Sequence, residues 1–170
     1  MAPVPLSDIT LKPSAFLTAI EANLAYLHSL EPDRLLHNFR VYAGLEPKAP
    51  IYGGWESDTI AGHTLGHYLT ACALMHAQTG DAACRERALY IVEELKACQD
   101  AGGDGYVAAF TRRGDDGGIE SGRRVFEEIA AGDIRPAKFY INGSWAPLYN
   151  WHKLFAGLHH ADVYFGSKTA

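Results

Sequence analysis

Long apolar runs and basic patches are both missing from this 170-residue sequence. No stretch reaches the roughly 20 apolar residues that span a bilayer, and the N-terminus lacks the basic segment and apolar core of a secretory signal. The 15 Lys and Arg are spread along a chain whose net charge is -5, so phosphate backbones and anionic lipids find no complementary surface. As written, the sequence predicts a cytoplasmic protein without nucleic acid or membrane partners; secretion of a longer parent stays open.

Cysteine is scarce as well. The three cysteines, Cys72, Cys84 and Cys98, include no CxxC pair, and each lies in a helical pattern among apolar neighbours. We interpret them as reduced core residues rather than as ligands or nucleophiles. The GxSxG, P-loop and Rossmann signatures are also absent, so the chemistry that those motifs carry is not indicated.

The sequence does contain a succession of helical patterns. Its composition, 48% hydrophobic and 21% charged, is that of one globular domain that buries roughly 70% of its unfolded surface. Gly80 and Asp81 predict a helix end followed by an N-cap, so two of the helices form an αα-hairpin. The predicted helices are 13–29, a short turn ending near 39, 59–79, 82–101, 123–131 and 147–165. Residues 43–51 and 111–121 are predicted loops, and 105–110 a short extended piece.

An aromatic loop with two glycines, residues 52–58, runs into a helix that carries His63 and His67. Four residues apart on a helix, the two side chains share one face. They could chelate a metal, but Thr64 stands where the zincin motif has Glu, and a third ligand would require the loop to fold back. Two other interpretations are a pair of satisfied histidines inside a bundle and a polar-ligand pocket, which nearby glycines would let a ligand approach.

The loop itself allows more than one interpretation. Glu56 and Asp58 could be the carboxylate pair of a glycosidase, or Asp58 could be the N-cap of the following helix. Trp55 and Trp145 could each stack on a sugar or belong to the core. A second aromatic loop, which contains Trp145, leads into a second helix with His152, and this echo of the first unit favours stacked helical hairpins.

Short motifs then follow one another in a distinctive order from about Leu6 to Ala170. They are Glu31-Pro32-Asp33-Arg34-Leu35-Leu36, Phe39-Arg40, Ala43-Gly44-Leu45, Tyr52-Gly53-Gly54-Trp55-Glu56, Gly62-His63, Gly66-His67-Tyr68-Leu69, Thr79-Gly80-Asp81, Glu94-Leu95, Cys98-Gln99, Gly105-Tyr106, Asn142-Gly143, Trp145, Tyr149-Asn150 and His152-Lys153. In this order they resemble the N-terminal portion of the bacterial and fungal β-L-arabinofuranosidase-type glycoside hydrolases, families 127 and 146, once a domain of unknown function.

The resemblance implies an all-α fold, an (α/α)6 barrel of helical hairpins in two concentric rings. Helices 59–79 and 147–165 would be inner helices and 82–101 an outer one. Because so few hairpins cannot close a barrel, we expect residues 1–170 to form a single, partial catalytic-barrel domain from the N-terminal side of a truncated barrel. Its uncovered apolar helix faces would then favour self-association.

The resemblance also implies retaining chemistry with a cysteine thiolate nucleophile, a glutamate acid/base and a zinc ion held by Cys and Glu. The three cysteines of this chain do not match that cluster. We therefore expect a glycoside hydrolase whose zinc belongs to the full-length parent, and a chain that by itself binds no metal and is inactive. The expected substrate contacts, with an arabinose-containing glycan, are Trp55, Glu56, His63, His67 and His152.

Two alternatives remain at this point. The chain could be a stand-alone helical carbohydrate-binding or scaffold module that uses the same Trp and His residues without catalysis. A metal-dependent hydrolase built on His63 and His67 ranks last.

Overall fold

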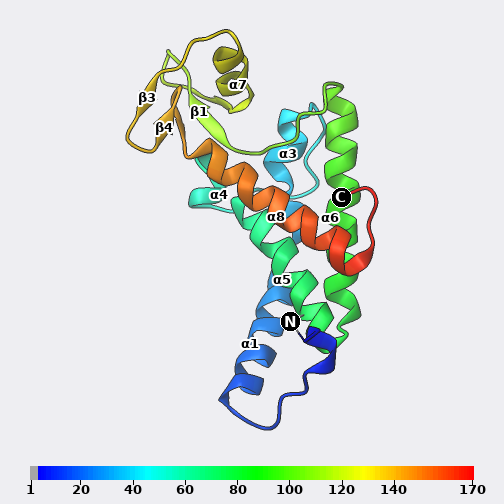
Figure 1. The fold of residues 1–170 in the computed structure, drawn as a ribbon. Coiled ribbons are helices and arrows are strands. Elements are labelled where there is room, and N and C mark those ends of the chain that lie inside the picture. The colour runs from blue at the N-terminus through cyan, green and yellow to red at the C-terminus, as the bar shows by residue number, and fades with distance from the viewer. Residues whose placement is uncertain (1–3) are drawn as a thin grey trace.

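The computed structural model describes residues 4–170, which form eight α-helices and five short strands (Figure 1). The helices are α1 (Ala15–Ser29), α2 (Pro32–Leu35), α3 (His37–Tyr42), α4 (Trp55–Asp58), α5 (His63–Thr79), α6 (Ala82–Gly102), α7 (Arg123–Ala130) and α8 (Pro147–Phe165), with a 3₁₀ turn at Leu6–Asp8. The strands are β1 (Thr111–Arg113), β2 (Ile119–Ser121), β3 (Pro136–Ala137), β4 (Tyr140–Ile141) and β5 (Ser144–Trp145). The predicted all-α class is confirmed.

The predicted hairpin of α5 and α6 forms as the sequence indicated. Gly80 ends α5 in the left-handed conformation, with φ at 74°, and Asp81 caps α6 by accepting a 2.8 Å hydrogen bond from the backbone N–H of Cys84. The prediction for 147–165 is likewise confirmed by α8.

The predicted start of helix 59–79 is wrong by four residues. α5 begins at His63, because Gly62 has φ at 95°, outside the helical region. The preceding loop forms the short helix α4, which the sequence did not predict, and Asp58 is its last residue rather than a cap. The Asp58 carboxylate instead pairs with Arg113 at 3.2 Å.

Helices α5 and α8 lie side by side and run in the same direction, as successive contacts along both helices show (Figure 1). They cross where Gly66 of α5 meets Gly157 of α8. A Cβ on Gly157 would lie 2.6 Å from the Gly66 carbonyl oxygen, and a Cβ on Gly66 would lie 2.7 Å from the backbone nitrogen of Leu154. Only residues without a side chain permit this separation of the two backbones.

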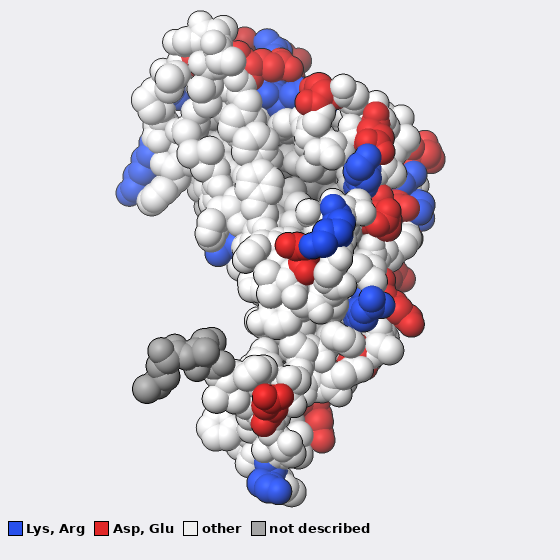
Figure 2. Space-filling model, turned by 45° about the vertical axis from the view of Figure 1, so that its right-hand side comes forward, with Lys and Arg blue, Asp and Glu red and all other residues white. Residues whose placement is uncertain are grey.

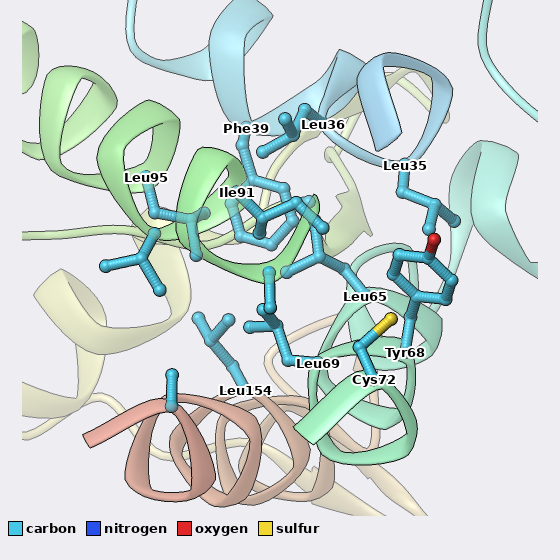
Figure 3. Packing of buried hydrophobic residues seen from close by; sticks show 14 of the residues in the cluster. Leu35, Leu36, Phe39, Leu65, Tyr68, Leu69, Cys72, Ile91, Leu95 and Leu154 are labelled. Atoms are coloured by element: carbon cyan, nitrogen blue, oxygen red, sulfur yellow. The ribbon is translucent and has the colours of Figure 1, made fainter. Parts of the chain in front are cut away.

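The core fills the space between α5, α6 and α8 (Figure 3). Leu65 and Leu69 of α5 pack with Ile91 and Leu95 of α6 and with Leu154 of α8. All three cysteines are free and buried, as the sequence predicted.

Helix α1 contributes less to this core than its apolar pattern suggested. It confirms the predicted helix 13–29, and Ser14 caps it, but Leu27 is its one buried residue and Phe16 is exposed. The helix is therefore held mainly near its C-terminal end.

The strands form a small region beside the start of α8, and one prediction fails here. Residues 111–121, a predicted loop, form the antiparallel hairpin of β1 and β2, which residues 105–110 precede without being part of a strand. β3, β4 and β5 form a second small antiparallel sheet, which the sequence did not predict. Each strand is two or three residues long, too short for a visible alternation of polar and apolar residues.

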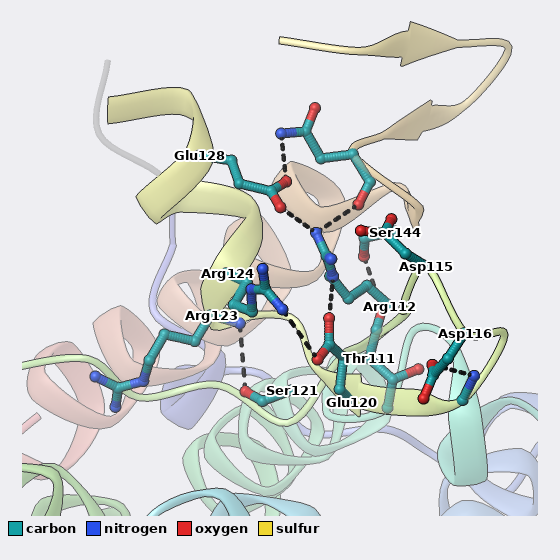
Figure 4. A network of polar contacts seen from close by, with 12 residues as sticks. Thr111, Arg112, Asp115, Asp116, Glu120, Ser121, Arg123, Arg124, Glu128 and Ser144 are labelled. Atoms are coloured by element: carbon teal, nitrogen blue, oxygen red, sulfur yellow. Dashed lines mark hydrogen bonds and ion pairs between the residues drawn. The ribbon is translucent and has the colours of Figure 1, made fainter. Parts of the chain in front are cut away.

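A buried arginine connects these strands to α7 (Figure 4). The Arg112 guanidinium pairs with Glu120 at 2.5 Å and with Glu128 at 2.8 Å. The Ser144 hydroxyl donates to the Thr111 carbonyl at 2.8 Å, which ties β5 to β1. This network fixes the strand that carries Trp145 and leads into α8.

Candidate functional site

Aromatic and imidazole rings from α4, α5, β5 and α8 meet near the N-terminal ends of α5 and α8. The Trp55 ring lies 5.9 Å from that of Trp145, edge to face, and 6.5 Å from that of His63. The His63 ring is 6.1 Å from both His67 and Tyr149. The two loop-and-helix units that echoed each other in the sequence thus form one site.

Glu56 lies buried beneath these rings and caps α5. Its carboxylate accepts hydrogen bonds from the backbone N–H groups of Gly62, at 2.9 Å, and Thr64, at 3.3 Å. It also lies 2.9 Å from Nδ1 of His63. Burial by itself would raise the pKa of Glu56, but the hydrogen bonds from His63, Thr64 and Gly62 outweigh it and hold that pKa below its usual value. Glu56 is therefore an anion that supports His63.

Contacts at Nδ1 fix the orientation of the His63 ring. Its Nδ1 also lies 2.7 Å from the Ile60 carbonyl, so this nitrogen carries the hydrogen that the two oxygens share. Burial lowers the pKa of His63, yet the hydrogen bonds to Glu56 and Ile60 more than compensate and the net pKa is raised. With Nδ1 engaged, Nε2 is the nitrogen that can meet a ligand, although it lies 3.5 Å from the Thr64 hydroxyl.

His67 is in the opposite electrostatic situation. Partial burial, followed by the charges of Lys153 and His63, lowers its pKa, and His152 adds to the effect. Its Nε2 lies 3.3 Å from the Tyr149 hydroxyl. The pKa of His63 is thus shifted upward and that of His67 downward, although the two rings lie only 6.1 Å apart.

The five residues that the sequence singled out differ in how closely they gather. Trp55, Glu56, His63 and His67 form a continuous cluster, whereas His152 is exposed on α8, outside the ring contacts that join these residues.

Asn150 is a supporting residue that the sequence analysis placed in a motif but did not assign to the site. Its side chain is buried, and its Nδ2 donates to the carbonyls of Ile60 and Ala61 at 2.7 Å each. It thereby ties the start of α8 to the turn that holds His63. An asparagine early in a helix has no sequence signal that distinguishes this role from an ordinary surface position.

The surface that these residues form is open. Trp55 is 64% exposed and Tyr149 40% exposed, so their rings are available to a ligand and Trp55 is not a core residue. Aromatic faces beside imidazole and ammonium groups suit a polar ligand with apolar C–H faces, such as a sugar.

The same geometry gives little support to a metal on His63 and His67. Over residues 4–170, ligand atoms of three or more His, Cys, Asp or Glu side chains come within 4.8 Å of one another at His28, Asp81 and Cys84, not at this histidine pair. Glu56 is engaged as a helix cap, and Asp58 pairs with Arg113. Glu56 and Asp58 therefore have separate structural partners.

A comparison with protein families gives this helical chain its class. The model of the family "Beta-L-arabinofuranosidase, GH127 catalytic domain" matches residues 8–170. The chain belongs to this family of glycoside hydrolases, and carbohydrate is the substrate class that the family implies. A search of the curated proteins finds no match. In residues 4–170, no helix has both the length and the apolar character to cross a membrane.

Proposed function

We propose that residues 1–170 form one partial barrel domain of a retaining glycoside hydrolase that acts on L-arabinofuranosides, and that they supply one wall of its sugar pocket. The observation that carries the proposal is the convergence of Trp55, His63, His67 and Tyr149 on one open surface. Trp55 and Tyr149 would pack against the sugar ring, and His63 and His67 would hydrogen-bond its hydroxyl groups. Glu56 would orient His63, and His152 would contact more distant parts of the glycan.

The arrangement of the helices supports placing this wall in an (α/α)6 barrel. Inner helices of such a barrel run parallel to one another, and each is followed by an antiparallel outer helix. α5 and α8 run in the same direction, and α6 returns antiparallel to α5, as that architecture requires.

The apolar surface supports the same placement. Leu148, Phe155 and Val163 of α8 are all more than half exposed. Figure 2 shows charged side chains gathered along one side of the molecule, next to a broad area that has few of them. An exposed apolar helix face is typical of a surface that another element covers.

The reacting groups are proposed to lie outside residues 1–170. The implied zinc site needs clustered Cys and Glu ligands, and a cysteine nucleophile needs a thiolate. Here burial raises the pKa of Cys72, and raises that of Cys98 to about 11, so neither thiol ionises readily. Cys84 is buried in the first turn of α6 and is not among the residues that form the sugar surface. These residues do not fit the implied zinc group beside the sugar surface, and no step of the reaction is assigned to them.

Saturation-transfer NMR with methyl β-L-arabinofuranoside tests the binding part of this proposal. We expect transfer to the sugar from the wild-type chain, and its loss in Trp55→Ala and His63→Ala. Tyr26→Ala is the matched control, because Tyr26 is an exposed aromatic on α1, away from the site. Transfer that persists in both site variants would refute the assignment of the sugar surface.

Hydrolysis tests the placement of the reacting groups. We expect the 170-residue chain to release no nitrophenol from p-nitrophenyl β-L-arabinofuranoside, with or without added Zn²⁺. Nitrophenol release that disappears when Cys72, Cys84 or Cys98 is substituted would overturn the proposal that the reacting groups lie outside residues 1–170.

A further inference from the structure

A second cluster of ligand-type side chains lies at the opposite end of α5 from the sugar surface. It joins His28 in the last turn of α1, Asp81 at the N-cap of α6 and Cys84 in the first turn of α6. Nε2 of His28 lies 3.0 Å from Oδ1 of Asp81 and 4.0 Å from Sγ of Cys84. The three ligand atoms all lie within 4.8 Å of one another, close to the spacing of neighbouring ligands around one tetrahedral ion.

We propose that His28, Asp81 and Cys84 bind one divalent cation, with Zn²⁺ as the best match. An imidazole nitrogen, a carboxylate oxygen and a thiolate sulfur are the three ligand types that this borderline-soft ion takes. The His28 side chain is 36% exposed and that of Asp81 19% exposed, so a water molecule can complete the coordination. This site is separate from the catalytic zinc that the family resemblance implies, and it departs from our expectation that this chain binds no metal.

The surroundings of the cluster fit a site that is fixed in place. Arg87 of α6 donates to the carbonyls of His28, at 2.9 Å, and Leu30, at 2.6 Å, and so holds the end of α1 against α6. Nδ1 of His76 lies 2.9 Å from the backbone carbonyl of Asp81 and steadies the turn between α5 and α6. Cys84 is fully buried beside them.

The location gives the ion a structural role. Leu27 is the one buried residue of α1, and Ile20 and Leu24 pack against the core while only partly buried. An ion bound by His28 on one side and by Asp81 and Cys84 on the other would join α1 to the α5–α6 hairpin. Binding replaces the S–H bond of Cys84 with a metal–sulfur bond and releases one proton to water, so affinity should rise with pH.

Cobalt binding to the chain, purified without a histidine tag and stripped with a chelator, tests this site. We expect one Co²⁺ per chain, tetrahedral d–d bands, and the near-ultraviolet sulfur-to-cobalt band that reports a thiolate ligand. Added Zn²⁺ should displace the Co²⁺ and abolish these bands.

Two variants test proposed ligands, and two serve as controls. Cys84→Ser should abolish the sulfur-to-cobalt band, and Asp81→Asn, which keeps an N-cap, should lose the stoichiometric binding. Cys98→Ser, a buried cysteine on the same helix, and His67→Gln, in the sugar surface, should both keep the full signal. Circular dichroism shows whether each variant is folded. If Cys84→Ser does not fold, metal binding by Asp81→Asn tests the proposal.

No Co²⁺ bound by the folded wild-type chain, or an unchanged spectrum in Asp81→Asn, would overturn this proposal. Loss of the signal in His67→Gln would do so as well, since it would place the ion at the sugar surface. Sugar binding is measured separately, in Trp55→Ala and His63→Ala, so the two proposals fail independently.

Discussion

The crossing of α5 and α8 makes Gly157→Ala a demanding test of how the site is assembled. The added Cβ would lie 2.6 Å from the Gly66 carbonyl oxygen and 2.8 Å from Cβ of Leu69. Ordinary contact begins at 3.4 Å, so the helices must separate by about 0.8 Å. Neither neighbouring atom can rotate away, because one belongs to the backbone and the other is attached directly to it.

Two opposing free-energy contributions set the stability cost of Gly157→Ala. Overpacking a core costs up to about 3 kcal/mol when the neighbours cannot yield. Replacing a helical glycine with alanine returns about 1 kcal/mol of helix propensity. We therefore expect Gly157→Ala to lose about 2 kcal/mol of unfolding free energy. At a urea m-value of about 2 kcal/mol/M, the unfolding midpoint should fall by about 1 M.

Urea unfolding followed by far-ultraviolet circular dichroism measures this change. Gly102→Ala is the matched control, because Gly102 is also helical and its Cβ would meet the flexible end of Arg123 at 3.3 Å. We expect that variant to be as stable as the wild type or slightly more so. A Gly157→Ala midpoint equal to that of Gly102→Ala would refute the close crossing.

Two further predictions concern the charge beneath the sugar surface and the apolar face of α8. In an NMR titration, the imidazole of His63 should titrate above 6.5 and that of His67 below it, and Glu56→Gln should lower the pKa of His63 because the facing carboxylate charge is gone. Because folding lowers the pKa of Glu56, its carboxylate stabilises the fold above about pH 4.5, and this stabilisation is lost as the pH falls through the folded-state pKa. Glu56→Gln should abolish this pH dependence of stability. An unchanged His63 pKa in Glu56→Gln would contradict the reasoning. Light scattering should show that the chain self-associates as its concentration rises, and that the double variant Leu148→Gln/Phe155→Gln associates less. A wild-type chain that stays monomeric would argue against an uncovered apolar face on α8.

Local signals in the sequence were sufficient for the long helices. Gly80 and Asp81 predicted the turn of the hairpin because a left-handed glycine and an N-capping carboxylate act within a few residues of one another. The same holds for the burial of the cysteines, since each lies on the apolar face of a regular helix. The order of motifs pointed to the glycoside hydrolase family, and the family match over residues 8–170 confirms it.

The sequence also misled where two interpretations were locally equivalent. Asp58 and Glu56 both precede α5, and the sequence left open whether Asp58 is the cap of that helix or one of a pair of carboxylates with Glu56. Glu56 takes that place because the turn from Thr59 to Gly62 reverses the chain and brings the α5 amides onto its carboxylate. No local pattern encodes that reversal.

By itself, the sequence determined the long helices, the turn at Gly80 and Asp81 and the family, because those depend on spacing within a few turns of chain and on the order of motifs. Only the tertiary structure decided which side chains meet. It brought Tyr149 to His67 across 82 residues and Asp81 to His28 across 53. Such contacts depend on how closely whole helices approach, and at Gly66 and Gly157 that distance is set by two missing side chains whose pairing no single stretch of sequence reveals.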